Sequence, residues 1–119
     1  MRILNALAAL SGLSALVLLV LSSHHMQGAA PEAIENLRLA AFTQLGSAVA
    51  GLAIASRNGR LNLIGGALIL VGAACFTAAV AAHSLAQNTM LLPLAPAGGI
   101  AMMIGWLVLA FAAPTKRPE

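Results

Sequence analysis

The chain alternates between long apolar stretches and short polar ones. Hydrophobic residues dominate four stretches, at about residues 3–21, 37–55, 61–82 and 94–113. At about 1.5 Å of helical rise per residue, each stretch is close to or above the length needed to cross a hydrocarbon core of about 30 Å. The pattern therefore predicts four membrane-spanning helices in a single domain, residues 1–119.

Turn-forming residues mark where these helices begin and end. Pro31 is followed by glutamates, which favour the positive end of a helix dipole, so we expect the second helix to begin there. Asn58-Gly59, between two arginines, predicts a tight turn before the third helix. Pro96 and the pair Gly98-Gly99 open the last helix. Connections this short join antiparallel neighbours, so we predict an all-α, integral membrane four-helix bundle with up-down-up-down order.

The first apolar stretch also fits a secretory signal. Arg2 would be its basic start, and Gly28-Ala29-Ala30 would be a loose cleavage site. However, residues 3–21 form a longer apolar run than a usual signal core of about 7–15 residues. We therefore predict that this stretch is retained as a helix.

Basic residues gather on one side of the four-span arrangement. Only Arg38 falls on the other side. Cytoplasmic ends of membrane helices carry an excess of lysine and arginine, so both termini are predicted to be cytoplasmic in a multi-pass protein of the cell inner membrane. The residues on the basic side are Arg2, Arg57, Arg60, Lys116 and Arg117.

Composition supports the bilayer as the solvent. Hydrophobic residues make up 61% of the chain and charged residues 8%, whereas a soluble domain carries about a quarter charged residues. The six basic residues are scattered and aromatic residues amount to 3%, so we expect no nucleic-acid partner. Cys75 is the single cysteine, which excludes a disulfide within the chain.

Small residues at helical spacing predict how the spans associate. Lipid tails are as apolar as leucine, so membrane helices associate by close backbone packing rather than by a hydrophobic drive. The residues predicted to pack the helices are Ser47, Gly51, Ala74, Ala78, Ala82, Gly98, Gly99, Gly105 and Trp106.

Four polar residues form a candidate site or cleft: His24, Thr43, Gln44 and His83. The topology places both histidines on the same side, where they and the neighbouring His25 could bind a metal or relay protons. The alternative for the histidines is that they simply face interfacial water. The alternative for Thr43 and Gln44 is that they form hydrogen bonds between the second helix and its neighbours.

The centres of the four spans lack ionisable side chains, which proton-coupled transporters usually need. The chain also has no aspartate, no phosphate-binding glycine loop and no metal-binding helix motif. We therefore expect no enzyme activity, cofactor or metal.

The most specific sequence motif lies in the last helix: Pro96-Ala97-Gly98-Gly99 followed by Gly105-Trp106. With this motif and with Ser11-Gly12 and His24, the chain resembles the domain of unknown function 423 family. The members of that family are small four-helix membrane proteins and include a vertebrate transmembrane relative. Thr43 stands where the family has a second histidine. The resemblance implies the four-helix fold, for a family that is largely uncharacterised.

The chain has many residues suited to helix packing and few suited to catalysis or ligand binding, and we base the expected function on this contrast. We expect the protein to be a structural or accessory subunit that packs with a larger membrane complex or with itself, surrounded by membrane lipid. The alternative is a transporter or channel for a small solute.

Overall fold

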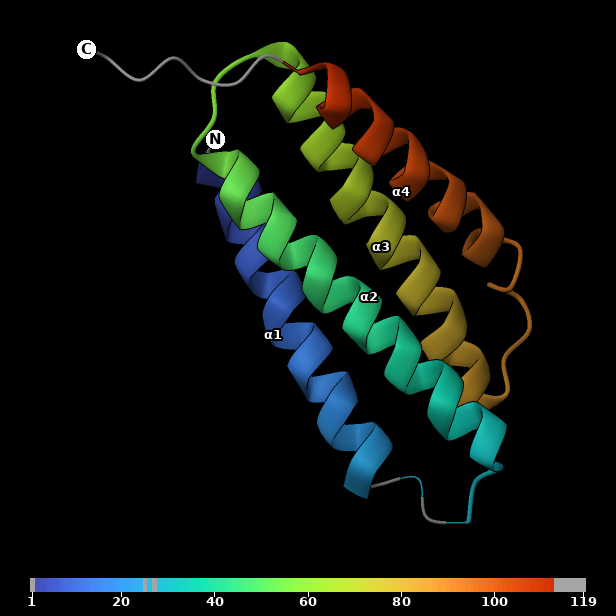
Figure 1. Ribbon diagram of the computed structural model, residues 1–119. Coiled ribbons are helices and arrows are strands. Elements are labelled where there is room, and N and C mark those ends of the chain that lie inside the picture. Colours follow the sequence, from blue (N-terminus) through green and yellow to red (C-terminus); the bar gives the residue numbers. More distant parts are fainter. Residues whose placement is uncertain (1, 25, 27, 113–119) are drawn as a thin grey trace.

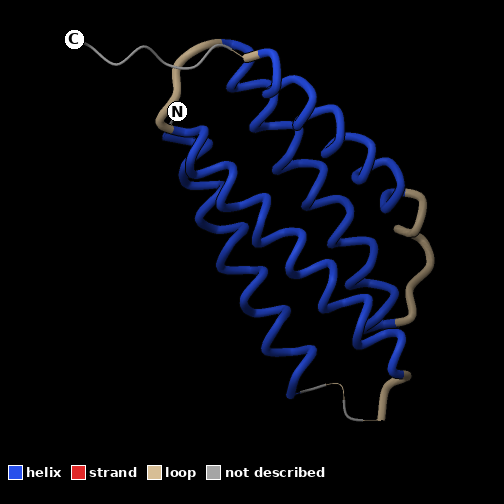
Figure 2. The backbone as a smooth tube through the Cα atoms, viewed as in Figure 1, coloured by secondary structure: helices blue, strands red, loops and turns tan. Residues whose placement is uncertain are grey.

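The protein is described from a computed structural model that covers residues 2–24, 26 and 28–112. These residues form four helices and, as Figure 2 shows, no strand. Each helix is long and apolar enough to cross a membrane. The predicted all-α bundle of four helices is confirmed. The helices are α1 (Arg2–His24), α2 (Pro31–Ala55), α3 (Arg60–Ala86) and α4 (Leu94–Phe111).

Successive helices run in opposite directions (Figure 1). The start of α1, the turn between α2 and α3, and the end of α4 therefore share one end of the bundle. We call it the arginine end, because Arg2, Arg57 and Arg60 lie there. The opposite end is the histidine end, where α1 finishes at His24 and α3 finishes shortly after His83.

Local backbone geometry sets the helix limits. Pro31 is the first residue of α2, as expected, and Gly59 precedes α3 with φ of 112°, a conformation that residues with a Cβ rarely adopt. α3 ends at Ala86, and the next residue, Gln87, donates its N–H to the His83 carbonyl oxygen at 3.0 Å and has a left-handed backbone that turns the following residue back toward the helix. The Asn88 N–H donates to the Ala82 carbonyl oxygen at 3.1 Å. These bonds satisfy the last carbonyl groups, so α3 reaches beyond the span predicted for it.

Helices adjacent in sequence are also the ones that pack most closely. α2 and α3 lie in the middle, and α1 and α4 lie at opposite edges (Figure 1). α1 and α3 run in the same direction and contact each other only lightly. A side-chain contact joins α2 to α4, where Ser47 Oγ lies 3.7 Å from Met102 Sδ.

Two glycine pairs bring α3 and α4 into backbone contact. Gly72 faces Gly98 and Gly65 faces Gly105, so the pairs lie two helical turns apart. A Cβ placed on Gly72 would lie 2.7 Å from the Gly98 carbonyl oxygen, and one on Gly105 would lie 2.9 Å from the Gly65 carbonyl oxygen. These distances leave no room for a side chain. Such close approach is how helices associate in lipid.

A second close contact joins α1, α2 and α3 near the arginine end. A Cβ on Gly51 of α2 would lie 3.0 Å from Ala8 Cβ and 3.1 Å from Leu70 Cδ1. Ala8 and Leu70 form a buried cluster with Leu4 and Ile54. The missing side chain of Gly51 therefore lets three helices meet at one level.

Candidate functional site: the groove between α1 and α3

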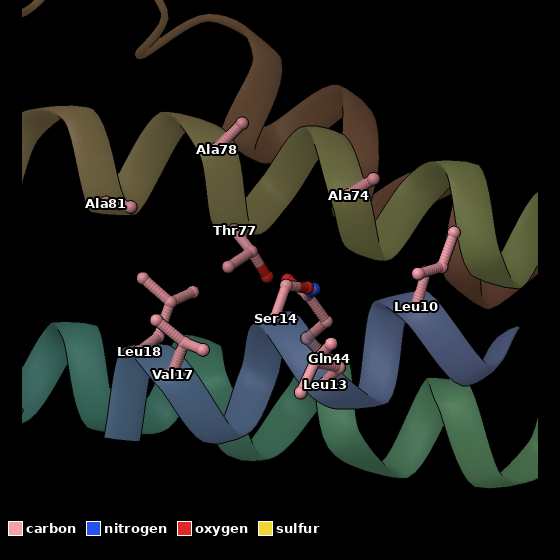
Figure 3. Close-up of a pocket in the computed structure, with 10 residues that line it drawn as sticks. All are labelled: Leu10, Leu13, Ser14, Val17, Leu18, Gln44, Ala74, Thr77, Ala78 and Ala81. Carbon is pink, nitrogen blue, oxygen red and sulfur yellow. The ribbon is translucent and has the colours of Figure 1, made fainter. Parts of the chain in front are cut away.

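A groove opens between α1 and α3. Its part toward the histidine end, which we call the outer groove, has a volume of about 510 Å³. Leucine and valine side chains of α1 form one wall, and Ala74, Ala78 and Ala81 of α3 form the other (Figure 3). The outer groove is therefore apolar on both walls and open on its outward side.

Polar side chains from three helices lie at the floor of the outer groove (Figure 3). Gln44 Nε2 of α2 donates to the Ser11 carbonyl oxygen of α1 at 3.0 Å and also to Ser14 Oγ. Ser14 Oγ donates to the same carbonyl oxygen at 2.9 Å. Thr77 Oγ1 of α3 donates to the Ala40 carbonyl oxygen of α2 at 3.3 Å. These bonds link α1 to α2 and α2 to α3 well inside the spans.

Among the described residues, no hydrogen bond reaches the amide oxygen of Gln44. The Ser11 carbonyl oxygen can only accept a hydrogen bond, so the amide nitrogen must face it and the oxygen points elsewhere. Within residues 2–24, 26 and 28–112, no group donates to Gln44 Oε1. The side chain is 6% exposed and lines the groove. An acceptor without a donor is unfavourable in hydrocarbon.

The groove continues toward the arginine end. A hollow of about 290 Å³ shares Leu10 and Ala74 with the outer groove and shares Leu7 with a further hollow of about 730 Å³. We call this last hollow the inner groove. Arg2, Ile3, Leu4, Leu7, Leu63 and Ala67 line it.

Of the four polar residues predicted for a site, Gln44 lies in the groove. Thr43 is exposed, and its Oγ1 donates to the Leu39 carbonyl oxygen of its own helix at 2.9 Å. His24 and His83 are exposed and line neither half of the groove. The structure does not bring these four residues together in the groove: Thr43 lies next to Gln44 on α2 but faces outward, and the histidines lie near helix ends.

Metal-binding groups do not gather in the part of the chain that the structure describes. No three His, Cys, Asp or Glu side chains there could hold a metal ion together. His25, which was considered as a ligand beside His24, lies outside the described residues. Cys75 is half-buried and free.

Ser14 and Thr77 are site residues that the sequence analysis did not select. Thr77 is 3% exposed and its hydroxyl donates to the Ala40 carbonyl oxygen, one turn from Gln44 on α2, whereas the Ser14 hydroxyl accepts from the Gln44 amide nitrogen. A usable signal was present, because both residues, like Gln44, lie inside a predicted span where polar side chains are unfavourable. The sequence could not show that the three share one level, since this depends on how the helices rotate and shift against one another.

The residues predicted to pack helices divide between interfaces and surface. Ser47, Gly51, Gly98 and Gly105 are buried against other helices.

The others are placed differently. Ala74 and Ala78 are exposed on the groove wall, and Ala82 is half-buried. A Cβ on Gly99 would meet nothing within 4 Å, and Trp106 is 54% exposed. Helical spacing puts small residues on one face, but it does not say whether another helix of the chain covers that face.

The four apolar helices define a small, all-α, multi-pass membrane protein. Residues 13–99 match the sequence model of the family described as "Protein of unknown function (DUF423)". Because this is well over half of the chain, the chain belongs to that family, as the resemblance implied. The matched range includes Pro96–Gly99 and ends before Gly105-Trp106. No curated protein and no solved structure matches the chain.

Proposed function

We propose that this chain is an accessory subunit or small scaffold of the cell inner membrane. Its outer groove would pack against a transmembrane helix of a larger complex or of a second copy. The observation that carries the proposal is the Gln44 amide on the floor of an open groove, whose oxygen receives no hydrogen bond from the described residues. A lipid tail cannot donate a hydrogen bond, whereas a helix with a serine, threonine, asparagine or glutamine can.

The alanine wall supports a helix as the occupant. Ala74 and Ala78 lie one helical turn apart and are exposed. Small residues at this spacing allow the backbone of a second membrane helix to approach closely. None of the described residues that line the outer groove is ionisable, which favours packing over proton-coupled transport.

The test compares Ala78→Trp, which fills the outer groove, with Ala9→Trp, which places the same bulk on an exposed face of α1. Blue-native electrophoresis after gentle detergent extraction should show the wild type and Ala9→Trp in an assembly larger than the monomer. Ala78→Trp should migrate as the monomer. A photoreactive residue at position 78 should form a protein adduct whose mass identifies a second copy or another subunit.

A bare wild-type monomer under gentle extraction would contradict the proposal. Equal loss of the assembly in both tryptophan variants would contradict the assignment to the outer groove.

A carrier for a small solute is the second candidate. It is favoured by the same polar floor, because Ser14, Gln44 and Thr77 could contact one polar group of a mainly apolar solute. Uptake by proteoliposomes that contain only the monomer, lost in Ala78→Trp and kept in Ala9→Trp, would favour the carrier over the scaffold.

A further inference from the structure

We propose that the inner groove binds one anionic phospholipid. Arg2 and Arg60 would contact its phosphate at the arginine end, and one acyl chain would lie between α1 and α3. This site goes beyond the proposed function, because it occupies the other half of the groove and requires no protein partner.

The inner groove is apolar along its walls and basic at its mouth. Arg2 lines the groove together with Ile3 and Leu63. Leu63 also lines an adjoining hollow that contains Arg60. Arg2 of α1 thus lines the apolar channel itself, and Arg60 of α3 lies in the hollow that adjoins it at Leu63. Basic pockets between membrane helices are suited to phospholipid headgroups.

The charges at this end favour an anion. The carboxylates of the described residues both lie near the start of α2, at the opposite end, where Glu35 is 3.9 Å from Arg38. Within the same described part of the chain, no carboxylate pairs with Arg2 or Arg60. α3 also begins without a side-chain cap, so the positive end of its dipole lies at the mouth of the groove. A phosphate would be attracted by both sources of positive charge.

The length of the groove fits an acyl chain. Half of a hydrocarbon core is about 15 Å thick, which equals the rise of about ten helical residues. Ten residues from Ile3 lead to Leu13, beside the floor formed by Ser14 and Gln44. The acyl chain would therefore run from the inner groove through the hollow of about 290 Å³ to the edge of the outer groove at Leu10 and Leu13.

The lipid and a partner helix can occupy the groove together. Membrane helices commonly cross at about 20° or about 40°. A helix that contacts α3 closely at Ala78 therefore moves away from it toward the arginine end. The inner groove would then stay open to a lipid.

The test uses the purified full chain in a nonionic detergent, with lipid binding measured by native mass spectrometry. Palmitoyl-oleoyl phosphatidylglycerol should bind at least about tenfold more tightly than the phosphatidylcholine with the same chains. Each of Arg2→Gln and Arg60→Gln should weaken phosphatidylglycerol binding by about fivefold, the effect of a basic side chain near an anionic headgroup. Arg57→Gln is the matched control, because Arg57 lies at the same end and lines none of these hollows. It should bind like the wild type.

A second pair of variants tests the acyl chain. Ala67→Leu should fill the inner groove and weaken phosphatidylglycerol binding, whereas Ala67→Ser should bind like the wild type. Thermal melting without added lipid verifies that each variant is folded.

Four results would overturn the proposal: equal binding of the two lipids, equal weakening by Arg57→Gln, no effect of Ala67→Leu, or displacement of phosphatidylglycerol by inorganic phosphate alone. Ala78→Trp keeps the inner groove open. Retained lipid binding in that variant, with loss of the larger assembly, separates this site from the proposed function.

Discussion

Helix α3 has two faces that use small residues with opposite results. On the face toward α4, Gly65 and Gly72 meet glycines of the partner helix, and the backbones touch. On the face toward α1, Ala74 and Ala78 remain exposed and a groove stays open. Both faces are apolar. Because lipid is apolar too, burial of apolar surface does not determine which face of α3 packs closely against a neighbouring helix. The steric fit of the facing residues determines this.

Enlarging a glycine of the closed face should have the largest effect. In Gly105→Leu, the new Cβ would lie 2.7 Å from Ile69 Cγ1 and 2.9 Å from the Gly65 carbonyl oxygen. We expect the free energy of unfolding in detergent to fall by at least about 3 kcal/mol, at the upper end of the overpacking range. The neighbouring Ile104→Leu, at an exposed position, should change it by less than about 0.5 kcal/mol. An unchanged melting temperature for Gly105→Leu would show that α3 and α4 do not pack as described.

Adjacent glycines give a sharper test of the same interface. Gly98→Ala places a Cβ 2.7 Å from the Phe76 backbone nitrogen and should lower the free energy of unfolding by about 1–3 kcal/mol. Gly99→Ala meets nothing within 4 Å and should raise it by up to about 1 kcal/mol, because alanine favours a helix over glycine. Thermal melts of the two variants in one detergent measure the difference. Effects of the same sign would contradict the assigned rotation of α4.

On the face of α3 toward α1, substitutions at the polar floor of the groove should lower the free energy of unfolding less than substitutions at the glycine contacts. Gln44→Leu removes two hydrogen bonds to α1 and should lower the free energy of unfolding by about 1 kcal/mol, since such bonds in membranes average about 0.6 kcal/mol each. Thr43→Val, which removes a bond within one exposed turn, is the control and should have a smaller effect. A double-mutant cycle with Ser14→Ala should show coupling between positions 14 and 44. Additive effects would mean that the two side chains do not interact.

The wall of the groove should have the smallest effect on stability. Ala78→Trp adds bulk where the side chain faces open space, so the free energy of unfolding should stay within about 0.5 kcal/mol of the wild type. The same variant should abolish the larger assembly. A strong loss of stability instead would show that position 78 is enclosed within the monomer.

Much of the fold could be predicted from the sequence, and less of the site. Pro31 and the turn at Asn58-Gly59 carry local conformational signals, and the structure places helix boundaries next to both. Gln44 was selected as a polar residue inside a span, and it lies at the floor of the groove. Its contacts with Ser11 and Ser14 on α1 could not be predicted, because they depend on the rotation and vertical position of a neighbouring helix.

The small residues show the same limit. Gly98 and Gly99 are adjacent in one motif. Gly98 contacts the backbone of Gly72, whereas a Cβ on Gly99 would meet nothing within 4 Å. In a soluble helix, polar residues would have marked the outer face. In a membrane helix both faces are apolar, so the pattern of hydrophobicity does not identify the packed side.

The amino-acid order alone predicts four apolar helices joined by short connections, because backbone groups in lipid must be satisfied within each helix. It also determined that basic residues collect at one end. Only the tertiary structure decided which face of each helix meets a neighbour. The close glycine contact of α3 with α4, and the groove left between α3 and α1, follow from steric fit between residues far apart in the chain.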